Sequence, residues 1–176
     1  MTTKELEQLL DRYGDSIYGF CLHLTGCKEQ ADDLYQDTFL KAIEVRQKIK
    51  LSNMEQDLLA AKNYIIGIAI RLWKKTLSKN IKRAQDVSLE DYLDCLVNPE
   101  DVAVQTEKRE LYFHLYKVVK GLPDKLRIVV YMYYSLEMGI RDIAEALHIP
   151  QGTVKSRLYI AREKIVEEME EMGYEI

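Results

Sequence analysis

Apolar residues recur at intervals of three and four along most of this chain, which is the period of an α-helix. Only eight glycines and three prolines interrupt its 176 residues. No segment alternates apolar and polar residues, as a strand with one buried face does. The pattern predicts an all-α protein, and a hydrophobic content of 47% is enough to build a packed core.

The N-terminal part of the pattern predicts three helices. Thr2 and Glu5 have the spacing of a capping box, and Gly26 is placed to end the first helix. The apolar face of the second helix consists of Ala31, Leu34, Tyr35, Thr38, Phe39, Ala42 and Ile43. We expect a loop at 50–56 and a third helix over about residues 58–79.

A change of composition then divides the chain. Residues 85–107 are acidic, contain Pro99 and lack a sustained apolar stripe, so we interpret them as a linker. The sequence therefore predicts two small helical domains, residues 1–84 and 108–176, joined by an acidic linker.

The C-terminal domain begins with a helical stripe from Leu111 that the turn sequence GLPD at 121–124 interrupts. The stripe then continues through Leu126, Val129, Val130 and Tyr133. Residues 135–139 are expected to form a turn before the next helix.

The spacing of Ala144, His148 and Val154 is that of a helix-turn-helix motif. A small residue lets the two helices approach, the turn residue adopts a left-handed conformation, and the apolar residue anchors the second helix. Glycine is the usual turn residue, although His tolerates positive φ better than most other residues.

The second helix of this motif has two distinct faces. Its inward face consists of Val154, Leu158, Ala161 and Ile165, and its outward face of Gln151, Lys155, Ser156, Tyr159 and Arg162. The outward residues could enter a DNA groove. A helical hairpin with a solvated basic face is the alternative, and the clean separation of the faces favours DNA binding.

A second basic segment, RLWKKTLSKNIKR at 71–83, contains no acidic residue. Such a helix suits phosphate binding, and its Trp73 could stack on a base. We favour a core position for Trp73, on the same face as Ile66 and Ile70.

The segment EQADDLYQDTFLKA at 29–42 has the opposite charge. Acids suit a helix start, but their persistence beside apolar residues favours a docking surface for a basic protein.

With these features the chain resembles a known family. RYGDSIYGFCLHLTG and EQADDLYQDTFLKA resemble region 2 of the extracytoplasmic-function (group 4) sigma factors of bacterial RNA polymerase. LPDKLRIVVYMYYSLEMGIRDIAEALHIPQGTVKSRLYIAREKI resembles their region 4. The resemblance covers almost the whole chain, with the two regions in the family's order.

Region 2 of such proteins binds the clamp helices of the polymerase β′ subunit through its acidic helix. The resemblance therefore implies a core polymerase contact at Asp32, Asp33, Gln36, Asp37, Phe39 and Leu40. In the family, the basic helix and the loop before it hold the melted −10 strand and capture a flipped base. Here those residues are Ser52, Asn53, Arg71, Lys74, Lys75 and Lys79.

Region 4 of the family reads the −35 element as a duplex. The resemblance implies base contacts from Lys155, Ser156 and Tyr159 and phosphate contacts from Thr153, Arg157 and Arg162, with Gln151 in the same surface. The chain departs from the common family residues at Arg71, Lys75, His148 and Ile160. The −10 specificity therefore does not follow from the resemblance.

The implied partners are core RNA polymerase, including its β flap, promoter DNA and an anti-sigma factor, and the linker would lie in the RNA exit path. A free-standing helix-turn-helix regulator and a sigma-like decoy that binds only an anti-sigma factor are alternatives. DDLYQDTFL argues against the regulator, and the two basic faces argue against the decoy.

Other classes of protein are disfavoured. The sequence has no nucleophile–base motif and no glycine-rich phosphate loop, so we expect neither an enzyme nor a cofactor. Cys21, Cys27 and Cys95 lack metal-ligand spacing and are expected to be reduced thiols. The longest apolar run, at 64–70, is too short to cross a bilayer, and a signal peptide is not recognisable, so we expect a cytoplasmic protein without membrane insertion.

Overall fold

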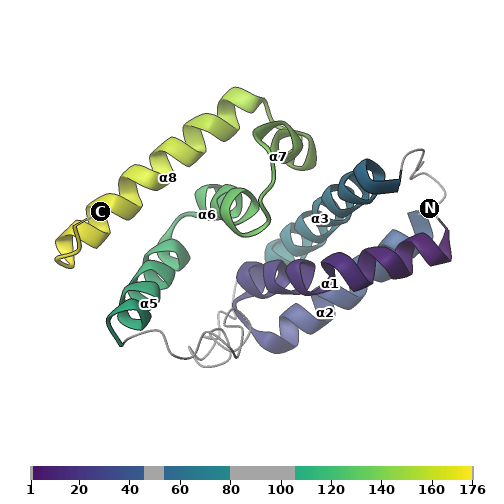
Figure 1. The fold of residues 1–176 in the computed structure, drawn as a ribbon, viewed down its shortest axis with the longest axis horizontal. Coiled ribbons are helices and arrows are strands. Elements are labelled where there is room, and N and C mark those ends of the chain that lie inside the picture. The colour runs from purple at the N-terminus through teal and green to yellow at the C-terminus, as the bar shows by residue number, and fades with distance from the viewer. Residues whose placement is uncertain (1, 46–53, 80–105, 176) are drawn as a thin grey trace. The chain divides into compact units, whose positions relative to one another are not determined.

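The computed structural model describes residues 2–45, 54–79 and 106–175, and every regular element in these ranges is helical. The chain divides into two compact units, Met1–Val87 and Ser88–Ile176 (Figure 1). The all-α prediction is confirmed. Within the described ranges, no helix is both long and apolar enough to cross a membrane.

The first unit is a bundle of α1 (Thr3–Thr25), α2 (Lys28–Val45) and α3 (Met54–Lys79), in which each helix packs against the other two. Both predicted ends of α1 are confirmed: Thr2 and Glu5 form the capping box, and Gly26 adopts φ 64° beyond the last turn. The core of the bundle comprises Leu9, Ile17, Phe20, Ile65 and Ile66, all fully buried.

Helix α3 begins at Met54, four residues before the predicted start. The expected loop at 50–56 is therefore wrong for its last three residues, and its remainder lies outside the described residues. Met54 lies four residues before Leu58 and so extends the apolar stripe back by one turn. Met54, Glu55 and Gln56 are also strong helix formers, so spacing and propensity together favour the earlier start.

Over residues 106–175, the described part of the second unit folds into helical elements that follow one another along the chain (Figure 1). They are α5 (Thr106–Gly121), α6 (Asp124–Val130), a π-helical turn η3 (Tyr131–Ser135), α7 (Ile140–Leu147) and α8 (Gln151–Glu171). Helix α8 packs against α5, α6 and α7. It is therefore the central helix of the unit, with one face left for solvent.

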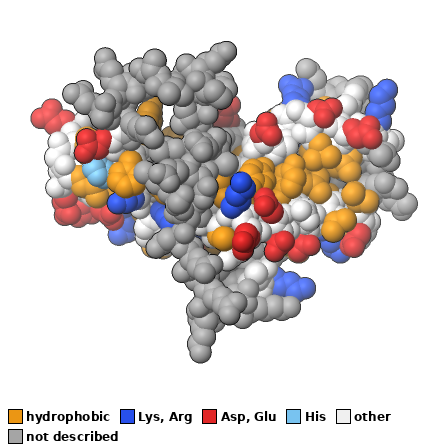
Figure 2. Space-filling model, turned by 90° about the horizontal axis from the view of Figure 1, so that it is seen from below, with side chains coloured by type: hydrophobic (Ala, Val, Ile, Leu, Met, Phe, Trp, Pro, Cys, Tyr) orange, Lys and Arg blue, Asp and Glu red, His pale blue; other side chains and the backbone are white. Residues whose placement is uncertain are grey.

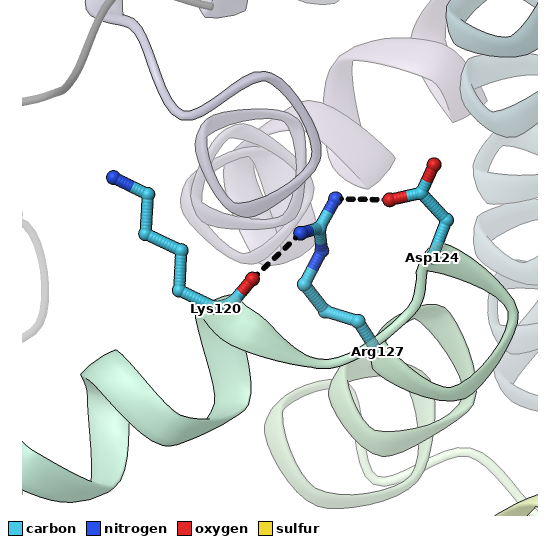
Figure 3. Close-up of polar contacts among 3 residues, drawn as sticks. All are labelled: Lys120, Asp124 and Arg127. Atoms are coloured by element: carbon cyan, nitrogen blue, oxygen red, sulfur yellow. Dashed lines mark hydrogen bonds and ion pairs between the residues drawn. The ribbon is translucent and has the colours of Figure 1, made fainter.

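Arg127 fixes the sharp junction between α5 and α6 (Figure 3). Its guanidinium donates one hydrogen bond to the carbonyl oxygen of Lys120 at 2.9 Å and another to the carboxylate of Asp124 at 2.6 Å. The first bond satisfies a carbonyl at the end of α5, where no intrahelical donor is available. The junction predicted from GLPD is confirmed, and Arg127 is the side chain that holds it.

Candidate nucleic-acid and protein interfaces

The junction between α7 and α8 has helix-turn-helix geometry. His148 lies beyond the end of α7 with φ 54° and ψ 48°, the left-handed conformation predicted for the turn residue. The N–H of Ile149 donates to the carbonyl oxygen of Ala144 at 3.0 Å and so closes the turn. Ala144 and Val154 are both buried where the two helices meet. The spacing of these residues therefore produces the predicted motif.

The two faces of α8 separate as predicted. Val154, Leu158 and Ala161 are buried and Ile165 is half-buried, whereas Gln151, Lys155, Ser156, Tyr159 and Arg162 are exposed. Thr153 and Arg157 are half-buried at the edge. Tyr159 is 64% exposed, an unusual position for an aromatic side chain without a partner. The outward surface therefore offers cations, a hydroxyl and an exposed ring to a ligand.

Arg162 has neighbours that the sequence pattern did not reveal. Its Nε donates a hydrogen bond to the hydroxyl oxygen of Tyr134 at 2.7 Å. The guanidinium carbon lies 5.9 Å from the ring centroid of Tyr133 and 5.7 Å from that of Tyr134. The hydrogen bond with Tyr134 raises the pKa of Arg162, which is fully exposed and carries its charge at any physiological pH.

The π turn explains why the apolar period does not predict that Tyr134 lies beside Arg162. An apolar period extended from Val130 predicts that Tyr133 faces inward, but η3 inserts an extra residue into the turn, with the Leu136 N–H bonded to the Tyr131 carbonyl. Tyr131 and Met132 are buried instead, and Tyr133 is only half-buried. The segment expected to turn at 135–139 begins inside this π turn and continues through Glu137, whose φ is 52°.

The basic face of α3 lies in the first unit. Arg71, Lys74 and Lys75 are exposed, and Trp73 is 5% exposed, so its predicted core position is confirmed. Arg71 also lies 5.9 Å from the ring of Tyr64, which is itself exposed. Lys79 ends α3 but its side chain lies outside the described residues, as do Ser52 and Asn53. The described face therefore contains three of the six predicted −10 contacts.

On the acidic helix α2, the predicted residues occupy different environments. Asp33, Gln36 and Asp37 are exposed, with Leu40 (61% exposed) on the same helix. Asp32 is half-buried and accepts a hydrogen bond from the Tyr18 hydroxyl at 2.7 Å.

Phe39 lies in the core, 8% exposed, with its ring 4.8 Å from that of Tyr35. Ile43, expected on the buried face of α2, is instead 42% exposed. Figure 2 shows hydrophobic side chains bordered by Asp and Glu on one face of the α1–α3 unit. The described surface of α2 thus combines Asp33, Gln36 and Asp37 with exposed Leu40 and Ile43.

Two titratable side chains of α1, Cys21 and His23, are buried. Burial lowers the pKa of His23 to about 4 and raises that of the Cys21 thiol to about 12, so both are neutral at pH 7. Cys27 is half-buried, and Cys95 lies outside the described residues. Within the described ranges, no three His, Cys, Asp or Glu side chains are grouped to hold a metal ion.

Each of the two units matches a known family of protein domains. Residues 9–83 match the family model for sigma-70 region 2, and residues 113–165 match that for sigma-70 region 4. The first match runs from within α1 to beyond the end of α3, and the second includes α7, the turn and the first fifteen residues of α8.

Curated relatives resemble the chain over most of its length. The ECF RNA polymerase sigma factor SigW of Bacillus subtilis is 28% identical over 93% of this chain and 88% of its own. The corresponding SigM of the same organism is 25% identical, with 94% and 93% covered. In fold, the chain is similar to the sigma factor RpoE of Bartonella quintana, solved in complex with the anti-sigma factor NepR. The TM-score is 0.72 at 19% identity, with 96% and 98% covered.

Proposed function

The chain belongs to the extracytoplasmic-function group of the sigma-70 family, and from this premise we propose how its surfaces are divided among core RNA polymerase and the two promoter elements. As a sigma factor it directs transcription initiation, binds core polymerase and promoter DNA, and catalyses no reaction of its own. The observation that carries the proposal is the division of α8 into a buried apolar face and a polar face on which Gln151, Lys155, Ser156, Tyr159 and Arg162 are exposed.

Helix α8 reads the −35 element in the major groove. Lys155, Ser156 and Tyr159 contact base edges, because their side chains are exposed near the middle of the outward face. The phosphate contacts come from Thr153, Arg157 and Arg162, and Gln151 lies at the start of the same surface. The left-handed turn at His148 supports this role by fixing the angle at which α8 leaves α7.

Helix α3 holds the melted −10 strand. The exposed cations Arg71, Lys74 and Lys75 neutralise its phosphates, and Lys79 with the segment at Ser52 and Asn53 completes the contact. Because Trp73 is buried, we do not assign it to base stacking. Opening the −10 element therefore depends on charge and on the preceding loop.

Helix α2 binds the clamp helices of the polymerase β′ subunit. Asp33, Gln36 and Asp37 supply charge and hydrogen bonds, and Leu40 supplies exposed apolar area. We leave Phe39 out of the contact because it is buried, and we assign Asp32 to the link with Tyr18.

The domain roles follow from these surfaces. Residues 1–84 carry polymerase docking and −10 opening, and residues 108–176 carry −35 recognition and the contact with the β flap. Residues 85–107 connect them; residues 106 and 107 already belong to α5, and 85–105 lie outside the described residues. We further propose a cytoplasmic location, where core polymerase is found. We also propose that the chain binds an anti-sigma factor, because the Bartonella protein of similar fold was solved in complex with one.

Charge reversal on α2 tests the docking surface. Asp33→Lys with Asp37→Lys should abolish co-purification with core polymerase and leave the fold intact. Glu7→Lys with Asp11→Lys is a matched control, because these exposed α1 acids have the same spacing and the change in charge is identical. Equal loss in both variants, or retained binding in the first, would contradict the assignment.

The promoter function is tested by fluorescence anisotropy of labelled promoter and scrambled duplexes at near-physiological salt. A chain of net charge −4 with two small basic faces should bind duplex weakly and with strong salt dependence. Adding core polymerase should produce sequence-specific binding, because each contact raises the effective concentration for the next. Tight, selective binding by the protein alone would instead favour a free-standing regulator.

A further inference from the structure

Two tyrosines from the π turn and one arginine from α8 form a surface cluster in the second unit. The rings of Tyr133 and Tyr134 meet edge to face with centroids 5.0 Å apart, and Arg162 lies against both. Tyr134 is 52% exposed, and Arg162 is exposed as well. Among the described residues, no carboxylate forms an ion pair with Arg162. A cation held between polar and aromatic groups, without a counterion, is suited to an anionic ligand.

The backbone places Tyr134 at this position through two uncommon features. The π turn gives Tyr131 and Met132 to the core and leaves Tyr134 outside. Glu137 then adopts a left-handed conformation with φ 52°, and the Met138 N–H returns to the Met132 carbonyl at 3.0 Å. π turns inside helical segments are often found at functional sites. The local fold therefore turns the Tyr134 hydroxyl toward α8.

The cluster borders the face of α8 assigned to the −35 element. Lys155 and Arg162 are seven residues apart, which is about two turns, so they lie along the same side of the helix. Tyr134 contacts Arg162 at the end of this row, from a segment 28 residues earlier in the chain. A duplex that contacts Lys155 and Tyr159 would have its sugar-phosphate backbone near the Tyr134 hydroxyl.

Tyr134 and Arg162 both keep hydrogen-bond donors that can reach a DNA phosphate. The Tyr134 oxygen accepts the bond from Arg162 Nε, so the tyrosine's own O–H remains a donor. The bond and the two rings also fix the direction of the guanidinium, whose terminal N–H groups can form the charge-assisted bonds that phosphates accept. We propose that Tyr134 and Arg162 form one composite site for a single DNA phosphate beside the −35 element, with Tyr133 supporting the arginine. This inference rests on the proposed function of α8.

The test uses holoenzyme reconstituted from core polymerase and the full chain. Promoter duplexes with a single neutral methylphosphonate at each phosphate around the −35 element are compared for affinity. Tyr134→Phe removes only the hydroxyl, and Arg162→Gln removes the charge. Each should weaken binding to the unmodified promoter about 10-fold, near the lower end expected for a hydrogen bond to a charged group, with unchanged thermal unfolding. Tyr112→Phe is the matched control, since Tyr112 is an exposed tyrosine of the same unit, on α5.

The decisive result is the position of the phosphate. With wild-type holoenzyme, one methylphosphonate should weaken binding by a similar factor, and both variants should be insensitive to that same position. The double variant should then lose less than the product of the two single effects, because the two residues share one contact.

The inference would be overturned if Tyr134→Phe bound the promoter with wild-type affinity. It would also be overturned if this variant lost affinity with a methylphosphonate at every position where the wild type does. Tighter binding by Tyr134→Phe would also overturn it, since the tyrosine would then withhold Arg162 from DNA. In each of these cases promoter recognition by wild-type holoenzyme still supports the proposed function. Failure of wild-type holoenzyme to select the promoter would remove both.

Discussion

The hydrogen bond between Tyr18 and Asp32 allows a structural role to be separated from a binding role on the same acidic helix. Tyr18 of α1 donates to the Asp32 carboxylate of α2 at 2.7 Å, whereas Asp33 beside it is exposed. Tyr18→Phe removes the hydroxyl and preserves the ring, which packs edge-on against Tyr35 at 5.6 Å. The substitution therefore tests the hydrogen bond without creating a cavity.

The expected loss follows from the charge and burial of this pair. A hydrogen bond to a charged group contributes about 1.5–3 kcal/mol, and partial exposure of Asp32 favours the lower end. We therefore expect Tyr18→Phe to cost about 1.5 kcal/mol. Asp33→Asn, an exposed substitution, should change stability by no more than about 0.5 kcal/mol. Its effect should appear in polymerase binding instead.

Urea unfolding at neutral pH provides the assay. Trp73 is the chain's one tryptophan and is buried in the same unit as Asp32, so its fluorescence reports the unfolding of that unit. With a slope of about 1–2 kcal/mol per M urea, Tyr18→Phe should lower the midpoint by roughly 1 M. An unchanged midpoint, or an equal decrease in Asp33→Asn, would refute the distinction between the two carboxylates.

Three further results are expected from other parts of the structure. The pKa of His23 is about 4 in the folded state and 6.5 in the unfolded chain, so the unfolded state binds a proton first as the pH falls. Acidification from about pH 6.5 to 4 should therefore destabilise the first unit by up to about 3 kcal/mol. In His23→Gln, the urea midpoint reported by Trp73 should depend less on pH. Glu137→Gly should stabilise the second unit by about 0.5–1 kcal/mol by relieving its positive φ, whereas Glu137→Ala should not, as circular dichroism would report. Lys74→Ala with Lys75→Ala should impair strand opening on every promoter. Permanganate footprinting of unpaired thymines measures the opening, and wild-type reactivity would contradict the role assigned to α3.

Most of the helical architecture could be predicted because it depends on local rules. The ends of α1 follow from a capping box and a glycine, and the helix-turn-helix follows from three residues at fixed spacing. The family resemblance depended on the same segments. Helix α8 could likewise be divided into two faces, because a 21-residue helix with a buried stripe maintains one period throughout.

The features that could not be predicted depend on breaks in that period or on tertiary contacts. The π turn shifts the register by one residue, which moves Tyr131 and Met132 inward and places Tyr134 against Arg162. The bond between Tyr18 and Asp32 joins two helices through side chains fourteen residues apart. Composition marks Asp32 as one acid among several, and only packing distinguishes it from Asp33.

The order of charges along α8 explains how an acidic chain can present cations to DNA. Its first fourteen residues include Lys155, Arg157, Arg162 and Lys164, whereas its last turn contains Glu168, Glu170 and Glu171. This order opposes the helix dipole, which favours acids at the first turn and cations at the last. The helix is therefore held by its packing on α5, α6 and α7, and its charges remain available for binding.

The distance between the two charged ends has a consequence for recognition. At a rise of 1.5 Å per residue, Glu168 lies about 20 Å along the axis from Lys155, which exceeds the Debye length of about 8 Å at physiological salt. The acidic end therefore does little to weaken the proposed DNA contact at Lys155, but it repels any duplex that lies along the whole helix. The part of α8 up to Lys164 is therefore the part suited to approach DNA closely, and the helix favours one orientation over sequence-independent binding.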